Sequence, residues 1–273
     1  MNKNSSLISQ LIVQNRGIDI SKYEEVFLAN SVLKRMKDTN CESESVYYNY
    51  LEQSSIEGDL FLNSLQVSYT EFFRNVLTFS VLEKIILPSL VLKMANSHRN
   101  EIRIWTSACA AGQETYSLAI LLHEILIGHR EKINFRIFAT DQSEVQIQEA
   151  QAGQYTESAL NGMNLKRANQ WFTKTGEMFT VKPELKENIE FSVFDLLSDQ
   201  FSCPPASIFG DFDLIVCANL LFYYKHEYQQ KIIHKTRECL ATKGYMITGE
   251  TERDILIHSG FHEVYPQSAI FQI

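Results

Sequence analysis

Two acidic side chains in this chain follow apolar segments at points where a ligand could be held. Asp141 ends the segment IFATD (137–141), and Glu114 lies in the turn ACAAGQET (108–115), which follows the segment IRIWTS. An acid at the end of a strand can hold the hydroxyl groups of a nucleotide ribose. A carboxylate such as that of Glu114 suits a cationic group such as an amine. The two acids together predict a ligand that carries a ribose and an amine.

The turn that contains Glu114 also limits the kind of ligand. Its small residues let a ligand approach the backbone, and the helix expected after it favours a negative group at its N-terminus. A dinucleotide fingerprint has three glycines, whereas this turn has only Gly112, which disfavours a pyrophosphate cofactor. S-adenosylmethionine has a carboxylate, an amine and a ribose, and it fits better. The alternative is that Glu114 only stabilises the first turn of a helix.

Three apolar segments of strand type must position these residues. They begin near Ile102, Ile137 and Phe212, and each breaks into small or polar residues where it ends. In a parallel sheet the ligand site lies at the carboxyl ends of the strands, so these three ends predict one binding crevice. From Val67 onward such segments alternate with helical patterns, which predicts an α/β fold with a doubly wound, mostly parallel sheet.

The first part of the chain has a different pattern. Residues 1–66 show helical periodicity without strong strands, which predicts a small N-terminal all-helical domain. Residues 67–273 then form the ligand-binding domain. Within it, the segment 172–190 contains the short apolar run MFTV and predicts a small inserted hairpin subdomain.

The composition is that of a globular protein and argues against several other classes. The chain has 273 residues, of which 45% are hydrophobic and 21% charged. Its formal net charge of −8 argues against nucleic acid as a partner, and its seven histidines lack a metal-ligand spacing. No apolar run approaches the roughly 20 residues that span a bilayer, so we expect no membrane insertion. The N-terminus lacks a signal-peptide pattern, and the five cysteines are scattered. We therefore expect a cytoplasmic protein with reduced thiols.

Seven segments of the chain, taken in order, form a recognisable set. They are TEFFR (70–74), the long helix after it, RIWTSACAAGQETYSLA, FATDQS, FDLL, FDLIVCANLLFYY and GETE. In this order they resemble the CheR family of chemoreceptor glutamate methyltransferases, from about Val67 to the end of the chain. The resemblance implies a sheet of the S-adenosylmethionine methyltransferase type behind a helical domain. It also implies methyl transfer from S-adenosylmethionine to receptor glutamates, with S-adenosylhomocysteine and glutamyl methyl esters as products.

The same resemblance, carried over position by position, implies roles for individual residues. Arg74 and Tyr223 are predicted to be catalytic, with Tyr223 next to the departing methyl group. Asp141 is expected to bind the ribose, Glu114 to lie near the methionine end, and Asp195 to lie beside the adenine. The full predicted set of cofactor-binding residues is Thr70, Arg74, Ala108, Glu114, Asp141, Asp195, Leu196, Asn219 and Leu220. The implied partner is a chemoreceptor-like signalling protein, reached by docking at membrane receptors.

The chain departs from the family pattern mainly on the substrate side. Ala218 stands where the family has an arginine, and the short segment around TKTGEM replaces a long loop. These departures predict a receptor contact that does not use a tethering tail peptide. Lys34, Arg35 and Lys37 resemble the basic helix that the family uses on receptors. Residues 1–66 nevertheless hold six Lys and Arg against nine Asp and Glu, a net charge of −3.

The chemistry of carboxyl methylation asks for few protein groups. A carboxylate nucleophile is already ionised at neutral pH, so no general base is required, and alignment and removal of water supply the rate enhancement. Arg74 could hold one carboxylate oxygen while the other attacks. Two other functions remain open. One is a cofactor-binding signalling module with weak or lost catalysis, suggested by Ala218. The other is a methyltransferase that acts on another protein or on a small molecule.

Overall fold

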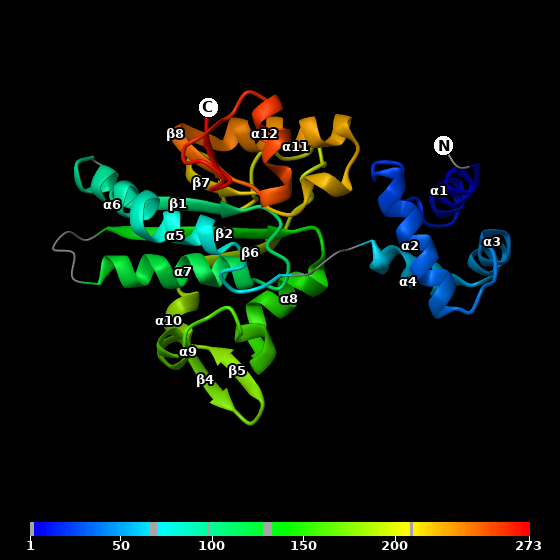
Figure 1. Ribbon diagram of the computed structural model, residues 1–273, viewed down its shortest axis with the longest axis horizontal. Coiled ribbons are helices and arrows are strands. Elements are labelled where there is room, and N and C mark those ends of the chain that lie inside the picture. Colours follow the sequence, from blue (N-terminus) through cyan, green and yellow to red (C-terminus); the bar gives the residue numbers. More distant parts are fainter. Residues whose placement is uncertain (1–2, 66–69, 98, 128–132, 208–209) are drawn as a thin grey trace. The chain divides into compact units, whose positions relative to one another are not determined.

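The computed structural model describes residues 3–65, 70–97, 99–127, 133–207 and 210–273 (Figure 1). The chain folds into two compact units. The first contains Met1–Val67 together with Phe222–Gln229, and the second contains Ser68–Leu221 and Gln230–Ile273. The first unit therefore includes a short segment that lies far from residues 1–66 in the sequence, which the sequence pattern did not predict.

The first unit is helical in its described N-terminal part, as the periodicity predicts. Its core is formed by apolar side chains that recur on one face of each helix, such as Leu28, Tyr47 and Phe61, all buried. Ser43 and Ser54 begin two of the helices by accepting a backbone N–H into their side-chain oxygens. The helices are α1 (Lys3–Arg16), α2 (Glu25–Asp38), α3 (Glu44–Gln53) and α4 (Ser55–Ser64).

The second unit contains a seven-stranded sheet of order β6-β2-β1-β7-β8-β10-β9, which confirms the predicted fold class. The first five strands pair in parallel, and the last two pair antiparallel at one edge. In β7 all five residues are buried, as expected for a parallel strand covered on both faces. The strands are β1 (Glu101–Thr106), β2 (Asn134–Asp141), β6 (Ile189–Val193), β7 (Phe212–Val216), β8 (Leu240–Ile247), β9 (His262–Glu263) and β10 (Ile270–Gln272).

Helices cover both faces of this sheet (Figure 1). One face carries α7, with α6 packed against α7 and β1, and the other carries α11 and α12. Helix α5 (Val76–Val81) continues through a short π-helix (Leu82–Ile86) into α6 (Leu87–Ala95). The other helices are α7 (Gln113–Leu126), α8 (Glu144–Ala152), α11 (His226–Cys239) and α12 (Arg253–His258). The described helices include none that is long and apolar enough to cross a membrane.

The inserted subdomain is larger than the predicted hairpin. The hairpin strands β4 (Phe172–Thr175) and β5 (Met178–Val181) are joined by β3 (Gln154–Thr156), which gives an antiparallel sheet of order β3-β5-β4. Helices α9 (Leu165–Trp171) and α10 (Pro183–Lys186) flank it. An outer strand of such a sheet can accept an added peptide strand. The prediction of a receptor contact without a tail peptide rested on a short hairpin, and the three-stranded sheet removes that basis.

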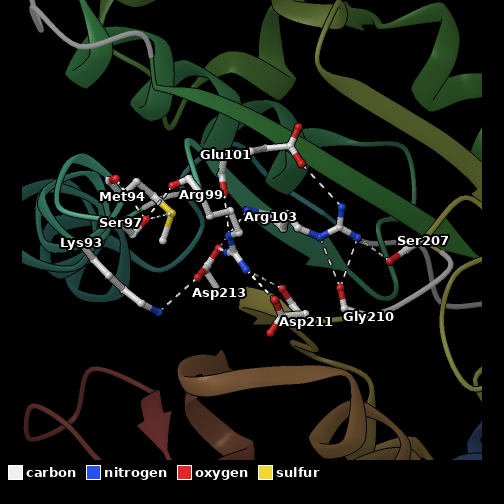
Figure 2. Close-up of polar contacts among 10 residues, drawn as sticks. All are labelled: Lys93, Met94, Ser97, Arg99, Glu101, Arg103, Ser207, Gly210, Asp211 and Asp213. Carbon is white, nitrogen blue, oxygen red and sulfur yellow. Dashed lines mark hydrogen bonds and ion pairs between the residues drawn. The ribbon is translucent and has the colours of Figure 1, made fainter.

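A buried aspartate holds the amino-terminal ends of β1 and β7 (Figure 2). The side chain of Asp213 is fully buried and accepts the backbone N–H of Arg103 at 3.1 Å. Its two oxygens also bind Lys93, at 3.3 Å, and Arg99. The two cations and the N–H group offset the loss of hydration of the carboxylate. These contacts fix the end of α6 to the sheet, away from the carboxyl ends of the strands.

The expectation of reduced thiols is wrong for two of the five cysteines. Cys203, in the loop between β6 and β7, forms a disulfide with Cys239, the last residue of α11. Cys41, Cys109 and Cys217 are free thiols. The two bonded cysteines are 36 residues apart in the sequence. Their pairing depends on how α11 packs beside the loop, so their spacing gave no sign of it.

We predict that reduction of this disulfide lowers the free energy of unfolding by about 2–4 kcal/mol, because the reduced chain gains loop entropy when it unfolds. Urea unfolding with and without reductant measures the change. Cys239→Ser should unfold at the same urea concentration in both conditions, and Cys41→Ser should behave as the unmodified chain does. A wild-type midpoint that reductant does not move would contradict the prediction.

Candidate active site

Asp141, at the end of β2, joins two of the turns that the sequence places at the binding crevice. Its Oδ2 accepts the backbone N–H of Ala110 at 3.0 Å, and its Oδ1 accepts the backbone N–H of Ser143 at 2.9 Å. Burial raises the pKa of Asp141, and these N–H groups oppose that shift. A carboxylate offers about four acceptor positions, so these two bonds leave capacity for ribose hydroxyls.

The turn between β1 and α7 has a backbone that requires small residues. Gly112 has φ 91° and Ala110 has φ 45°, both in the left-handed region. A Cβ atom at Gly112 would lie 3.0 Å from the Ala150 Cβ and 3.2 Å from the ring of Tyr116. The glycine is therefore needed both for its φ angle and for the close packing against α8. Ala108, at the start of the turn, is partly exposed.

The segment that contains Thr70 and Arg74 is attached to the first turns of α7. The backbone N–H of Phe73 donates to the Ser117 Oγ at 3.1 Å, and this hydroxyl donates to the Gln113 carbonyl at 2.7 Å. Phe73 has φ 54°, an unusual value for a phenylalanine, and its side chain is buried. The next residue, Arg74, is exposed. Thr70 is partly exposed.

Glu114 lies in the first turn of α7, and its pKa depends on burial and on charged residues from other segments. Burial raises its pKa to about 7, the positive charge of Arg74 opposes the rise, and the negative charge of Glu252 adds to it. The charge of Arg74, from the segment before α5, thus acts on Glu114. A cationic ligand would stabilise the ionised form of this carboxylate and lower its pKa.

The remaining predicted cofactor residues follow β6 and β7. Asn219 and Leu220 are partly exposed, and Asn219 is in the left-handed region with φ 59°. Asp195 is exposed and accepts the backbone N–H of Leu197 at 2.9 Å, whereas Leu196 is buried. The parallel pairing of β6 with β2, and of β7 with β1, brings these turns to the edge of the sheet where β2 ends at Asp141.

Tyr223, the second predicted catalytic residue, belongs to the first unit. Its backbone carbonyl accepts the N–H of Glu24 at 2.9 Å, and its ring centroid lies 4.7 Å from that of Phe27. The neighbouring Tyr224 stacks on Tyr23 with 5.1 Å between the ring centroids. These are packing contacts of two aromatic rings, so the catalytic role of Tyr223 stays a prediction.

Two family models match this chain. The model described as "CheR methyltransferase, SAM binding domain" matches residues 68–264, and that described as "CheR methyltransferase, all-alpha domain" matches residues 4–65. The chain belongs to the CheR methyltransferase family. It is therefore a methyltransferase that depends on S-adenosylmethionine, as the sequence pattern predicts.

The relatives of this CheR family member cover most of its length. A chemotaxis protein methyltransferase of Borreliella burgdorferi is 29% identical, covering 90% of this chain and 87% of the relative. Those of Listeria innocua and Escherichia coli are 26% and 28% identical, covering 93% and 90% of this chain and 91% and 82% of the relatives.

The residues present fit S-adenosylmethionine. Asp141 keeps acceptor capacity for the ribose, Glu114 offers a carboxylate for the amine, and the α7 N-terminus favours the cofactor's carboxylate. Among the residues that the structure describes, no group of three or more His, Cys, Asp or Glu could hold a metal ion. Sequence reasoning missed Ser117, which anchors the Arg74 segment, and Glu252. The only sign of Glu252 in the sequence is its place in GETE, to which no role was assigned.

We predict that Asp141→Asn weakens the binding of S-adenosylhomocysteine by about 1.5–3 kcal/mol, because an amide cannot replace both acceptor oxygens. Isothermal titration calorimetry gives the affinity. Ser143→Ala is the matched control, since it removes the cap of α8 and keeps the carboxylate. Equal affinities of Asp141→Asn and the unmodified protein would remove Asp141 from the site.

We predict that the affinity for S-adenosylhomocysteine depends on the ionisation of Glu114. The cofactor amine favours the ionised carboxylate, whose pKa is about 7 without ligand. The affinity should therefore be constant above this pH and fall towards about tenfold per pH unit below it, with release of a proton on binding. Calorimetry in buffers of different ionisation enthalpy detects the proton. Glu114→Gln should abolish this dependence and Glu144→Gln, at the first turn of α8, should keep it.

Proposed function

We propose that this CheR family member forms glutamyl methyl esters on a chemoreceptor-like signalling protein. The observations that carry the proposal are the effect of the Arg74 charge on the pKa of Glu114 and the hydrogen bond from the Phe73 N–H to the Ser117 Oγ, which attaches the Arg74 segment to α7. We assign Glu114 to the amine of the cofactor and Arg74 to the substrate carboxylate. The three relatives described above are chemotaxis protein methyltransferases, and their names support a receptor as the substrate.

The reaction requires orientation more than acid–base chemistry. When bound, S-adenosylmethionine supplies a methyl group activated by its sulfonium charge. A substrate carboxylate is ionised at neutral pH and needs no base. The planar guanidinium of Arg74 can bind one carboxylate oxygen and leave the other directed at the methyl group. The buried rings of Phe72 and Phe73 anchor the backbone of this segment in the core, and Arg74 itself is exposed.

Only two of the three basic residues near the end of α2 are exposed cations, because Arg35 is bound inside the first unit. The Arg35 guanidinium binds the buried Glu57 at 2.9 and 2.7 Å, and Glu57 also accepts the hydroxyl of Tyr47 at 2.8 Å. Arg35 thus belongs to the internal structure of the unit. Lys34 and Lys37 are the exposed cations of this helix segment. We propose that these two lysines contribute to receptor docking.

Ala218, where the family has an arginine, packs against the apolar core. Arg253 and Arg74 are the two candidates that could supply a positive charge in its place, and Arg253 binds Glu263 through two nitrogens at 2.7 and 2.6 Å. The alanine in place of the family arginine is the observation that favours the second candidate function, a cofactor-binding module with weak catalysis.

We predict that Arg74→Lys lowers the methylation rate at least about tenfold, because lysine keeps the charge but loses the planar fork. The affinity for S-adenosylhomocysteine should change less. Membranes that contain chemoreceptors are incubated with methyl-labelled cofactor, and label released by base measures ester formation. The matched control is Arg136→Lys, an exposed arginine paired with Glu190.

The same assay separates the functions. Base-labile label on a receptor supports the proposal, and an unchanged rate for Arg74→Lys would remove carboxylate binding from that residue. Binding of the cofactor without any transfer would favour the non-catalytic module. Label on a small molecule or on another protein would favour a redirected methyltransferase.

A further inference from the structure

Glu252, the last residue of the segment GETE, is a fully buried acid outside the predicted site. It lies between the end of β8 and the start of α12. Its oxygens accept hydrogen bonds from two segments of the second unit. The donors are the backbone N–H groups of Asn219 (2.7 Å), Leu221 (2.6 Å) and Gly249 (2.8 Å) and the hydroxyl of Thr248 (2.9 Å).

Two of these bonds define the turn that follows β7. The N–H groups of Asn219 and Leu221 flank Leu220, and each binds a different oxygen of the Glu252 carboxylate. Asn219 is held in the left-handed region, with φ 59°, which is unfavourable without such support. Asn219 and Leu220 are the two cofactor residues assigned to this turn. Glu252 therefore sets the backbone from which both reach the ligand.

The packing around Glu252 leaves no room for a side chain at Gly249. A Cβ atom at Gly249 would lie 2.8 Å from the Glu252 Oε2 and 2.9 Å from the Asn219 Oδ1. Because Gly249 has no side chain, the Glu252 carboxylate can accept the backbone N–H of Asn219. Three of the donors bind Oε2 and the Leu221 N–H binds Oε1, so a carboxylate, which only accepts, suits the site. A glutamine would turn an N–H₂ group towards some of these donors.

Glu252 also bears on the charge of the cofactor site. Its negative charge raises the pKa of Glu114, against the effect of Arg74. The titratable thiols of Cys109 and Cys217 are buried beside the same acids, and the charge of Glu114 helps to raise the pKa of both. A cationic ligand at Glu114 therefore interacts with the negative charge of both Glu114 and Glu252.

We infer that Glu252 is a positioning residue for methyl transfer, which holds the turn at Asn219 and Leu220 in place and whose negative charge acts on Glu114. This inference rests on the assignment of the cofactor to these residues, but not on the identity of the methylated protein. It assigns a function to GETE that goes beyond its place in the family pattern.

The test measures S-adenosylhomocysteine affinity between about pH 5.5 and 8.5 for Glu252→Gln. The affinity at high pH should fall at least about tenfold, because donors in the turn lose their acceptors. The midpoint of the pH dependence should move to lower pH, because Glu114 loses a repelling charge. A purely structural role would weaken binding and leave the midpoint where it is. That result would overturn the charge part of the inference.

Two further variants keep the inference testable if Glu252→Gln does not fold. Thr248→Val removes one donor and keeps the charge, so it should weaken binding modestly without moving the midpoint. Glu252→Asp keeps the charge on a shorter side chain, so it should weaken binding and keep the wild-type midpoint. If Glu252→Asp binds as tightly as the unmodified protein, positioning by Glu252 is wrong.

The design separates this inference from the proposed function. Binding of S-adenosylhomocysteine requires no substrate, so a failure to methylate receptors does not affect the result. Glu114→Gln shows whether the pH dependence belongs to Glu114. If that variant keeps the wild-type dependence, the assignment of Glu114 fails and the charge part of the inference fails with it.

Discussion

The parallel pairing of β1 with β2 and β7 is the constraint on which the site depends. Because these strands run in the same direction, the turns after them meet at one edge of the sheet, although they are far apart in the sequence. Asp141 strengthens this arrangement, since its carboxylate at the end of β2 binds the backbone of the turn after β1. At the other end of the sheet, the buried Asp213 of β7 binds the backbone of β1 and two cations, one of which, Lys93, lies on α6 (Figure 2). These contacts connect β1, β7 and α6.

Opposed charges near the start of α7 decide what this edge can bind. Glu114 is an acid with a raised pKa, and Arg74 and Glu252 shift that pKa in opposite directions. A ligand with both an amine and a carboxylate satisfies such a site better than an ion of one sign would. This balance gives a physical reason for a zwitterionic cofactor in a family described by its S-adenosylmethionine-binding domain.

The substrate side shows how side-chain pairing changes the meaning of a sequence pattern. Three basic residues on α2 suggest a basic surface, yet Arg35 is bound to Glu57 inside the first unit. Arg253 looks available to replace the family arginine at Ala218, yet it is bound to Glu263. In both cases the partner lies on another element, so the charge that remains for a substrate cannot be counted from the sequence.

The sequence by itself determined the α/β fold, the helical first domain, the family and the cofactor, because strand ends and short motifs are local features. It also indicated Asp141 and Glu114, whose positions follow from where the strands end. Only the tertiary structure decided the disulfide between Cys203 and Cys239, the third strand of the inserted sheet, and the bonds from Glu252 to the turn at Asn219. Each of these joins residues that are distant in the sequence, and such contacts depend on packing that no local pattern specifies.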